Sequence, residues 1–255
     1  MAEPKFIEVK THISARATTV FRFLSDPQSF AQWMGPGSGI VSKNGGEISV
    51  RYPNGDIGRG EVLEVVANRK LVFSWGYEGG KNGLAPGSSR VTIELVEEAG
   101  GTVVTLRHEG LDAVQRQAHS SGWNYYLGSL SAKGADRQFA TALPQLIATY
   151  VASWNETDSR KRWQLLESCW EPEGTYRDPF GSAEGVSAID QYIAGAQMFA
   201  PGRILRSQQV PARTQGYARF LWTVSDPKGQ ALHSGMCFGK LRPSNRFIEV
   251  VGFWN

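Results

Sequence analysis

The stretch "HSSGWNYYLGSLSAKG" (residues 119–134) predicts the helix that completes a first domain. Trp123, Tyr126, Leu127 and Leu130 recur at i, i+3, i+4 and i+7, which places one apolar stripe along a helix. The stripe then stops in small and charged residues, with nearly half of the chain still to follow. We therefore expect this helix, over residues 119–131, to close one domain before a second begins.

The chain before this helix alternates between strand and helix patterns. "FIEVKTHI" (residues 6–13) has the two-residue period of a half-buried strand, and "ATTVFRFLSDPQSFAQWM" predicts two short helices interrupted at "SDP". From residue 45 onward, five alternating segments are separated by turns rich in Asn, Gly and Pro. They are "EISVRY", "IGRGEVLEVV", "KLVFSWGY", "SRVTIELVEE" and "GTVVTLRHEG". A curved antiparallel sheet wrapped around one long helix follows from this order.

Composition and charge exclude several classes of function. The net charge is +3 and the basic residues are scattered, so we expect no nucleic-acid partner. The apolar runs are too short to span a bilayer, and "MAEPKFIEVK" lacks the apolar core of an export signal. Only Cys169 and Cys237 are present, which fits reduced thiols and a cytoplasmic location. The 8 Trp, 8 Tyr and 12 Phe are enough for both a core and a ligand pocket.

The first half resembles the helix-grip SRPBCC superfamily, and within it proteins like the activator of the heat-shock ATPase. The resemblance covers about residues 5–133. It is carried by "SARATTVFRFLSDPQSFAQWM", "GRGEVLEVVANRKLVFSW", "SRVTIELVEEAGGTVVTLRHEGL" and the H-x-x-GW-x-x-x-L pattern from His119 to Leu127. The resemblance implies a cavity between the sheet and the closing helix, used in this superfamily for lipids, hormones or aromatic polyketides.

The second half begins again with helices and ends in strands. "TALPQLIATYVASWNETD" and "SRKRWQLLESCW" predict two helices, the second with Trp163, Leu166 and Trp170 on one face. "GTYRDP" predicts a short strand and "GVSAIDQYIAGAQMF" a third helix. Four alternating segments close the chain: "RILRSQQVPA", "GYARFLWTV", "ALHSGMCFGKL" and "RFIEVVGFW". Helices covering one concave sheet form a second α+β unit.

This half resembles the SnoaL-like branch of the nuclear-transport-factor-2-like cone fold, over about residues 142–255. The resembling elements are "YVASWNETD", "LLESCW", "G-x-YRDP", "ARFLWTV", "DPKG" and "RFIEVVGFW". We therefore expect an α+β chain in which residues 1–133 form a helix-grip domain, 134–141 a linker and 142–255 a SnoaL-like cone domain. The resemblance also implies a homodimer through the open sheet face of the second domain.

Candidate ligand-binding residues in the first half are mostly aromatic. We expect Trp33, Trp75, Tyr77, Trp123 and Tyr126 as a set to line the cavity that the resemblance implies, whereas each ring taken alone is better explained as part of the core. His119 lies one turn before Trp123 and shares its face, where it could be a base, a hydrogen-bonding anchor or a surface histidine. We expect Trp123 to face the cavity, so that replacement by Ala costs roughly 1–2 kcal/mol instead of the 3–5 kcal/mol of a filled core.

Candidate residues in the second half are more polar. The resemblance places Tyr176 and Asp178 at the rim of a pocket, whereas Asp before Pro is also an ordinary turn residue. His233 and Cys237 share one face of a predicted strand, and Arg219 lies on the neighbouring strand. Many SnoaL-like relatives carry an acid where this chain has Cys237, so the cysteine removes a carboxylate from that position. The full set expected to line the second pocket is Trp154, Tyr176, Asp178, Arg219, Trp222, His233 and Cys237.

Three classes of function remain open. The preferred interpretation is binding of a small, mostly apolar, aromatic or lipid-like molecule without demonstrated catalysis. The alternatives are a polyketide-cyclase-like or isomerase-like enzyme that uses Asp178 and His233 for proton transfer, and a co-chaperone-like interaction module. The dispersed His and Cys residues give no metal-ligand spacing, and no glycine-rich loop leads from a strand into a helix, so we expect no metal and no cofactor.

Overall fold

The structure, a computed structural model, describes residues 6–255; the expectation about an export signal rests partly on residues 1–5, which lie outside the described residues. The chain divides into two units, residues 1–138 and 139–255. Each unit has its own antiparallel-rich sheet and its own hydrophobic core. The α+β fold class expected from the sequence is confirmed.

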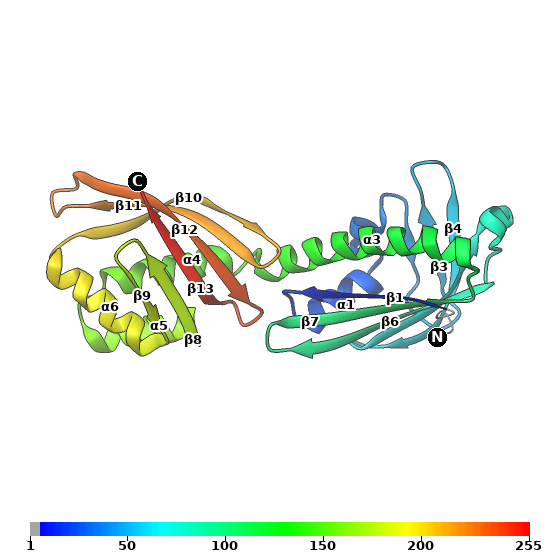
Figure 1. The fold of residues 1–255 in the computed structure, drawn as a ribbon, viewed down its shortest axis with the longest axis horizontal. Helices are drawn as coiled ribbons and strands as arrows, with labels where there is room; N and C mark the ends of the chain where they lie inside the picture. Colours follow the sequence, from blue (N-terminus) through cyan, green and yellow to red (C-terminus); the bar gives the residue numbers. More distant parts are fainter. Residues whose placement is uncertain (1–5) are drawn as a thin grey trace. The chain divides into compact units, whose positions relative to one another are not determined.

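The first unit is a seven-stranded antiparallel sheet with helices on one face (Figure 1). Its strand order is β1-β7-β6-β5-β4-β3-β2, so the first strand pairs with the last. The alternation in "FIEVKTHI" is borne out, because Ile7, Val9 and Ile13 are all buried in β1. The elements are β1 (Phe6–Ile13), α1 (Ala17–Ser25), α2 (Pro27–Met34), β2 (Gly39–Ile40), β3 (Glu47–Arg51), β4 (Ile57–Val66), β5 (Lys70–Tyr77), the 3₁₀ helix η1 (Glu78–Gly83), β6 (Ser89–Glu98), β7 (Gly101–Glu109) and α3 (Ala113–Phe139).

The "SDP" segment separates the two short helices by capping both of them. The backbone N–H of Asp26 donates to Arg22 O at the end of α1, and its carboxylate accepts from Ser29 N, 2.8 Å away, at the start of α2. Pro27 occupies the first turn of α2, where a missing N–H costs nothing. The sequence prediction of two helices is therefore confirmed.

Helix α3 is longer than the sequence predicted. It spans Ala113–Phe139 instead of residues 119–131, so residues 134–139 of the expected linker are helical. At Gly134 the helix packs closely against β1, because a Cβ at this position would lie 3.2 Å from the Ile13 side chain. The predicted apolar stripe is confirmed, and Leu127 and Leu130 are fully buried, each contributing roughly 1.5–3 kcal/mol of apolar burial.

The second unit is a six-stranded sheet covered on one face by three helices. Its strand order is β10-β11-β12-β13-β8-β9, and the β13–β8 pair is parallel. A β-bulge between Gln208 and Ala212 accommodates the proline of the edge strand β10. The elements are α4 (Leu143–Asn155), α5 (Ser159–Cys169), β8 (Trp170–Asp178), β9 (Gly181–Glu184), α6 (Val186–Phe199), β10 (Ile204–Thr214), β11 (Tyr217–Ser225), β12 (Ala231–Arg242) and β13 (Arg246–Trp254).

Trp163 and Trp170 do not share a helix face as predicted. Helix α5 ends at Cys169, and Trp170 instead begins β8, where it pairs with Phe247 of β13. This pairing buries the Trp170 ring against Tyr150 and Phe247. Trp170 therefore joins the sheet and does not extend α5 by one more residue. Trp163 is partly exposed and borders a shallow surface hollow of 550 Å³ that also contains Glu167 and Arg246.

Candidate functional site

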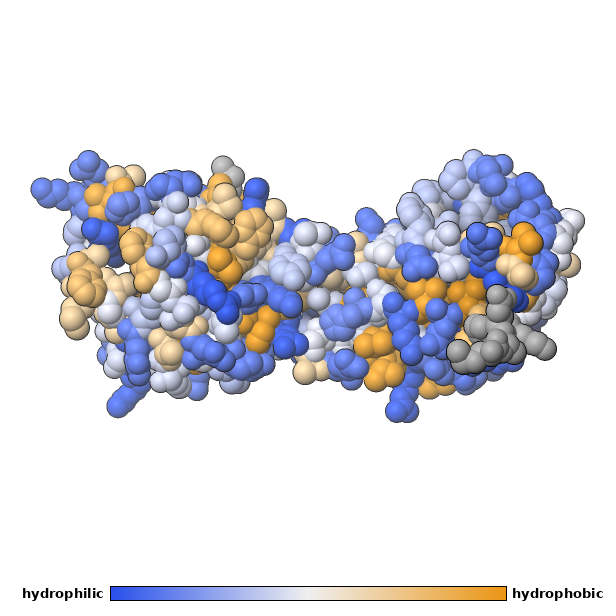
Figure 2. All heavy atoms as spheres, in the orientation of Figure 1, coloured by the Kyte–Doolittle hydropathy of each residue, from blue (hydrophilic) through white to orange (hydrophobic). Residues whose placement is uncertain are grey.

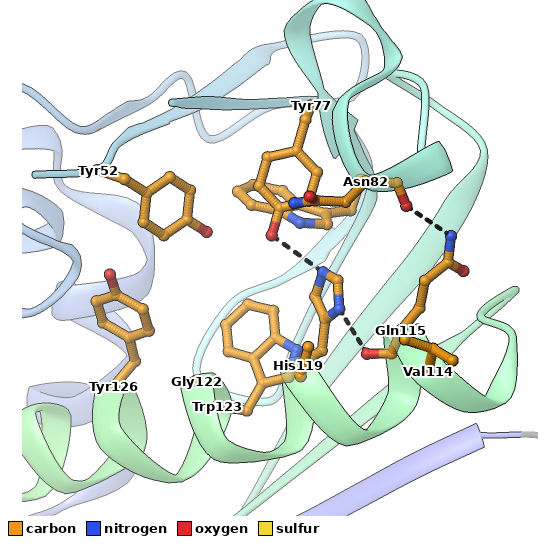
Figure 3. A pocket seen from close by; sticks show the side chains of 11 residues that line it. Tyr52, Tyr77, Asn82, Val114, Gln115, His119, Gly122, Trp123 and Tyr126 are labelled. Carbon is orange, nitrogen blue, oxygen red and sulfur yellow. Dashed lines mark hydrogen bonds between the residues drawn. The ribbon is translucent and has the colours of Figure 1, made fainter. Parts of the chain in front are cut away.

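A pocket of 450 Å³ opens in the first unit between the first half of α3, the end of β5, η1 and the segment that follows β3 (Figure 3). Such a volume is typical of small-molecule sites. None of its lining residues carries a formal positive or negative charge at neutral pH. They are Tyr52, Trp75, Tyr77, Asn82, Val114, Gln115, Ala118, His119, Gly122, Trp123 and Tyr126.

Two indole rings form the inner wall of the pocket. Trp75 from β5 and Trp123 from α3 lie with ring centroids 6.3 Å apart, and they are only 1% and 4% exposed. Trp123 thus lines the pocket as expected, but most of its ring is packed in the core. The expected cost of replacing Trp123 by Ala is corrected accordingly, to roughly 3–5 kcal/mol.

Tyr77 and His119 form the polar edge of the pocket. His119 Nδ1 lies 2.8 Å from the carbonyl oxygen of Gln115, which can only accept a hydrogen bond. The proton of the neutral ring is therefore on Nδ1, and Nε2 accepts from the Tyr77 hydroxyl at 3.1 Å. Gln115 also donates through its side chain to Asn82 O at 3.0 Å, which connects α3 to η1 (Figure 3).

Burial keeps the polar groups of the pocket uncharged. It lowers the pKa of His119, against the opposing effect of the hydrogen bond to Gln115, so the imidazole is neutral at pH 7. Burial also raises the pKa of Tyr52, Tyr77 and Tyr126, so all three phenols remain protonated. The pocket consequently offers ring surfaces and neutral hydrogen-bonding groups.

A second histidine lies behind this wall. Trp123 Nε1 donates to Nδ1 of the fully buried His108 at 3.0 Å, and His108 Nε2 lies 2.9 Å from Ser89 Oγ. The Ser89 hydroxyl donates to Trp75 O, so His108 must donate to Ser89 through Nε2–H. Burial, with a smaller effect from His119, lowers the pKa of His108 to about 3. His108 therefore orients the wall of the pocket as a group that is neutral at pH 7.

The structure separates the aromatic residues that the sequence had grouped together. Trp75, Tyr77, His119, Trp123 and Tyr126 all line the pocket. Trp33 does not: its Nε1 donates to Phe23 O at 2.8 Å, and its ring packs edge-on against Phe30 within the core. Trp33 therefore lies on the buried face of α2, where it packs against α1 and helps to fill the core.

Some lining residues were not recognised in the sequence. Tyr52 lies just beyond β3, and its ring contacts both Tyr77 and Tyr126, at centroid distances of 5.9 and 6.4 Å. Its even spacing with Ile48 and Val50 along the strand was an available signal for the inner face. Gln115 lies one turn before His119, so extending the helical stripe backwards would have found it.

The interior of the second unit is filled by its own aromatic rings. Tyr150 is buried at the centre and contacts Trp154, Trp170, Phe220 and Phe247 at centroid distances of 5.4 to 6.3 Å. The predicted pocket residues Tyr176, Trp222 and Cys237 are only 3–4% exposed. These rings therefore occupy the space in which a ligand pocket was expected.

Asp178 is held by four hydrogen bonds. Its carboxylate accepts from the hydroxyls of Tyr176 and Tyr192, at 3.0 and 2.5 Å, and from the backbone N–H groups of Phe180 and Gly181, at 2.9 and 3.1 Å. Both tyrosine pKa values are raised by burial and by Asp178. The carboxylate thus orders the β8–β9 turn, which accounts for its position before proline.

The remaining polar residues predicted for the second site do not meet at one point. His233 is exposed near the start of β12, with its ring 5.6 Å from that of Trp254. Arg219 pairs across the sheet with Phe238, on the face opposite Cys237, so it lies outside the expected pocket. Burial raises the pKa of Cys237 to about 12, which leaves an unreactive thiol.

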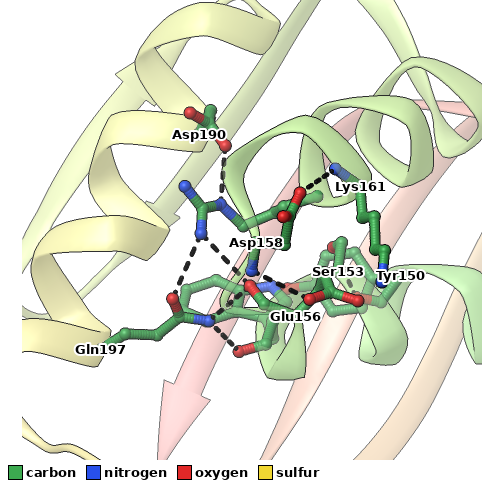
Figure 4. Close-up of polar contacts among 9 residues, drawn as sticks. Tyr150, Ser153, Glu156, Asp158, Lys161, Asp190 and Gln197 are labelled. Carbon is green, nitrogen blue, oxygen red and sulfur yellow. Dashed lines mark hydrogen bonds and ion pairs between the residues drawn. The ribbon is translucent and has the colours of Figure 1, made fainter.

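A buried arginine joins the helices of the second unit (Figure 4). Arg162 Nε donates to Asp190 Oδ1 at 2.6 Å, and its Nη1 donates to the carbonyl oxygen of Glu156. Gln197 donates to the carbonyl oxygens of Trp154 and Glu156, both at 3.0 Å. These side chains satisfy the free carbonyl groups at the end of α4, so the network is structural.

Within residues 6–255, which the structure describes, no group of three His, Cys, Asp or Glu side chains is arranged to hold a metal ion. None of the helices described there is long and apolar enough to cross a membrane.

The fold and the pocket define the class: an α+β helix-grip pocket domain followed by an α+β cone domain. Residues 14–133 match the family described as activator of Hsp90 ATPase homolog 1-like protein. An AHSA1-like protein from Rhizobium etli is 34% identical, over 51% of this chain and 81% of that one, with a TM-score of 0.41. The chain therefore belongs to the AHSA1-like family through its first half.

The second half is matched by a different group of solved structures. A protein from Agrobacterium tumefaciens, described as a putative isomerase of the SnoaL-like family, is 30% identical, over 45% of this chain and 98% of that one, with a TM-score of 0.44. The second half therefore belongs to the SnoaL-like family.

Another similar solved structure is the Aha1 dimer from Colwellia psychrerythraea. It is 19% identical, over 49% of this chain and 92% of that one, with a TM-score of 0.43. A comparison with curated proteins found no match.

Proposed function

We propose that the first unit binds a small, mostly apolar molecule with a flat aromatic ring in the pocket between β5 and α3. The observation that carries this proposal is the 450 Å³ pocket, whose walls are aromatic rings and whose polar groups are uncharged. Apolar pockets with a few placed polar groups are typical ligand sites. A lipid chain could use the same apolar walls, but the flat rings favour a planar ligand.

The test is a matched pair of glycine substitutions in α3. At both Gly122 and Gly128 an added Cβ meets nothing within 4 Å, but only Gly122 lines the pocket. Binding of 2-methylnaphthalene to the full chain is followed by tryptophan fluorescence. We expect binding to wild type and to Gly128→Leu, and loss of binding in Gly122→Leu, because the leucine side chain fills the pocket. Equal binding by the two variants would show that the ligand site lies elsewhere.

Proton transfer by Asp178 and His233 has less support. The four hydrogen bonds to Asp178 occupy its carboxylate, and His233 lies exposed against Trp254. A general base must reach its substrate with a free lone pair. Binding without catalysis is therefore the function that the geometry supports best.

The outer face of the second sheet supports assembly into a homodimer. Phe238 and Phe253 pack edge-on at 6.0 Å and are 44% and 48% exposed. Figure 2 shows apolar atoms gathered over the region of β12 and β13. Large apolar side chains on a sheet face that no helix covers are typical of an interface. A second copy of the chain is the proposed partner, and the unpaired cysteines suit a reducing, cytoplasmic compartment.

A further inference from the structure

Three asparagines of the first unit are followed directly by glycine: Asn44, Asn54 and Asn82. The side-chain amide at such a step can be attacked by the backbone nitrogen of the next residue, and glycine hinders this attack least because it has no Cβ. All three asparagines are exposed, so water reaches each of them. The hydrogen bonds around each step therefore decide which asparagine reacts first.

The step at Asn44 is tied into the sheet. Gly45 N, the atom that would attack the Asn44 amide, donates to Val62 O at 2.8 Å, and Val62 N donates to Gly46 O at 2.7 Å. Val62 lies in β4 and is fully buried, so these bonds break only if the strand moves. A backbone nitrogen that keeps such a bond cannot turn towards the side chain.

The step at Asn54 is held at both of its reacting groups. Gly55 N donates to Tyr52 O at 3.0 Å. The Asn54 amide donates to Asp56 Oδ2 at 3.0 Å, and its oxygen accepts from Asp56 N at 3.1 Å. Closure of a ring between Gly55 N and the Asn54 side chain would break these bonds, which slows the reaction at this step.

The step at Asn82 is freer. Asn82 lies in η1, a bent 3₁₀ segment in which Gly79, Gly80 and Asn82 all have positive φ angles. Among the residues that the structure describes, no hydrogen bond joins the Asn82 side chain to another residue, and none joins Gly83 N to a residue outside η1. A Cβ at Gly79 or Gly80 would meet nothing within 4 Å, so the backbone before Asn82 has room to turn.

One hydrogen bond opposes this turn. Gln115 Nε2 donates to the backbone oxygen of Asn82 at 3.0 Å (Figure 3). Ring closure rotates the bond between the Asn82 Cα and its carbonyl carbon, and this rotation moves the oxygen. The Gln115 side chain therefore restrains the reaction, and its removal should accelerate it.

We infer that Asn82 is a site of spontaneous deamidation that changes the charge of the pocket. The Gly83 nitrogen forms a bond to the side-chain carbonyl carbon of Asn82 and loses its proton. The side-chain nitrogen leaves with that proton as ammonia, which gives a five-membered imide. Water then breaks one of the two ring C–N bonds to the imide nitrogen, and the product is aspartate or isoaspartate. No oxidant or reductant takes part.

The product places a carboxylate in a pocket that otherwise has none. Asn82 lines the pocket, and none of the lining residues carries a formal charge at neutral pH. Cations are attracted both by a carboxylate and by the faces of aromatic rings. Resting on the proposed function, deamidation therefore shifts the preference of the pocket from neutral aromatic molecules towards planar aromatic cations.

Peptide mass spectrometry of the full chain, incubated at mildly alkaline pH, measures the reaction at the three asparagines together. We expect deamidation at Asn82 to be at least roughly fivefold faster than at Asn44 or Asn54, because one net hydrogen bond slows ring closure by about that factor. Gln115→Ala should accelerate the reaction at Asn82 by a similar factor and leave the other two rates unchanged. Equal rates at the three asparagines, or a faster reaction at Asn44 or Asn54, would overturn the assignment.

Two probes of equal shape test the consequence for binding. 1-Methylquinolinium is a cation, and 1-methylnaphthalene is its neutral counterpart. We expect Asn82→Asp to raise the affinity for the cation, relative to the neutral probe, by roughly fivefold, the effect of one nearby carboxylate in water. Asn44→Asp, outside the pocket lining, should leave the ratio unchanged.

The outcomes separate this inference from the proposed function. An unchanged ratio in Asn82→Asp would overturn the shift in preference and leave the apolar pocket standing. Failure of both probes to bind to any form of the chain would overturn the proposed function and the shift in preference with it. The deamidation site itself stands or falls by the three rates from mass spectrometry.

Discussion

Trp123 and His108 are joined by a hydrogen bond from the indole Nε1 to the imidazole Nδ1, 3.0 Å long and buried. The bond connects α3 to β7 directly behind the pocket, and His108 in turn donates to Ser89 on β6. One face of the Trp123 ring therefore borders the pocket, whereas its polar edge belongs to the core.

The Trp123–His108 bond should contribute measurably to stability. Trp123→Phe removes the donor and leaves His108 Nδ1 buried without a partner, so we expect a loss of about 1–3 kcal/mol in the free energy of unfolding. Urea denaturation measures this loss, with Tyr125→Phe as an exposed aromatic control. A change below about 0.5 kcal/mol, the usual range for surface substitutions, would mean that the bond is absent in solution.

Stability should fall in acid because of His108. Its pKa is about 3 in the folded protein and near 6.5 when unfolded, so the unfolded chain binds a proton more readily between these values. The contribution of neutral His108 to the free energy of unfolding is complete above pH 6.5. It is lost progressively as the pH falls towards 3. By pH 5 the loss should reach about 2 kcal/mol. Denaturation curves of His108→Asn should depend less on pH than those of wild type; equal dependence would contradict the assignment.

The Arg162–Asp190 pair should be important for the second unit. Arg162 is only 4% exposed, so Asp190→Asn leaves a buried positive charge without its counter-ion, and we expect a loss of about 3 kcal/mol. Glu249→Gln is the control, because its pair with Arg177 is exposed and should contribute at most about 1 kcal/mol. Equal effects of the two substitutions in thermal unfolding would show that the buried pair contributes no more to stability than the exposed pair.

The outer face of the second sheet should mediate dimerisation. Phe238→Lys places a charge in the proposed interface, so we expect a wild-type dimer and a monomeric variant in sedimentation at micromolar concentration. Val96→Lys, at an exposed position of the first unit, should leave the dimer intact. A wild-type chain that sediments as a monomer would refute this assembly.

Periodicity was enough to predict most of the fold. The two-residue alternation identified β1 and the meander from β3 to β7, and the stripe from Trp123 to Leu130 identified α3. The ends of elements were harder, because β8 begins at Trp170 through a parallel pairing with distant Phe247. Such a contact depends on tertiary structure and leaves no local pattern.

The candidate site was predictable where one element supplied neighbouring residues. His119, Trp123 and Tyr126 follow from helical spacing, and Trp75 and Tyr77 from strand alternation. His108 could not be found in this way, because its meeting with Trp123 depends on how α3 lies across the sheet. Sequence also could not separate rings that line a pocket from rings that fill a core. Trp33 and the aromatic rings inside the second unit fill a core.

We propose that the ligand binds in the first unit and not in the second. The most direct measurement is the movement of assigned tryptophan indole N–H resonances in the full chain as 2-methylnaphthalene is added. The account predicts that the signals of Trp75 and Trp123 shift, while those of Trp154 and Trp222 stay in place. Shifts confined to Trp154 and Trp222, or no shift at Trp75 and Trp123 at saturating probe, would contradict it.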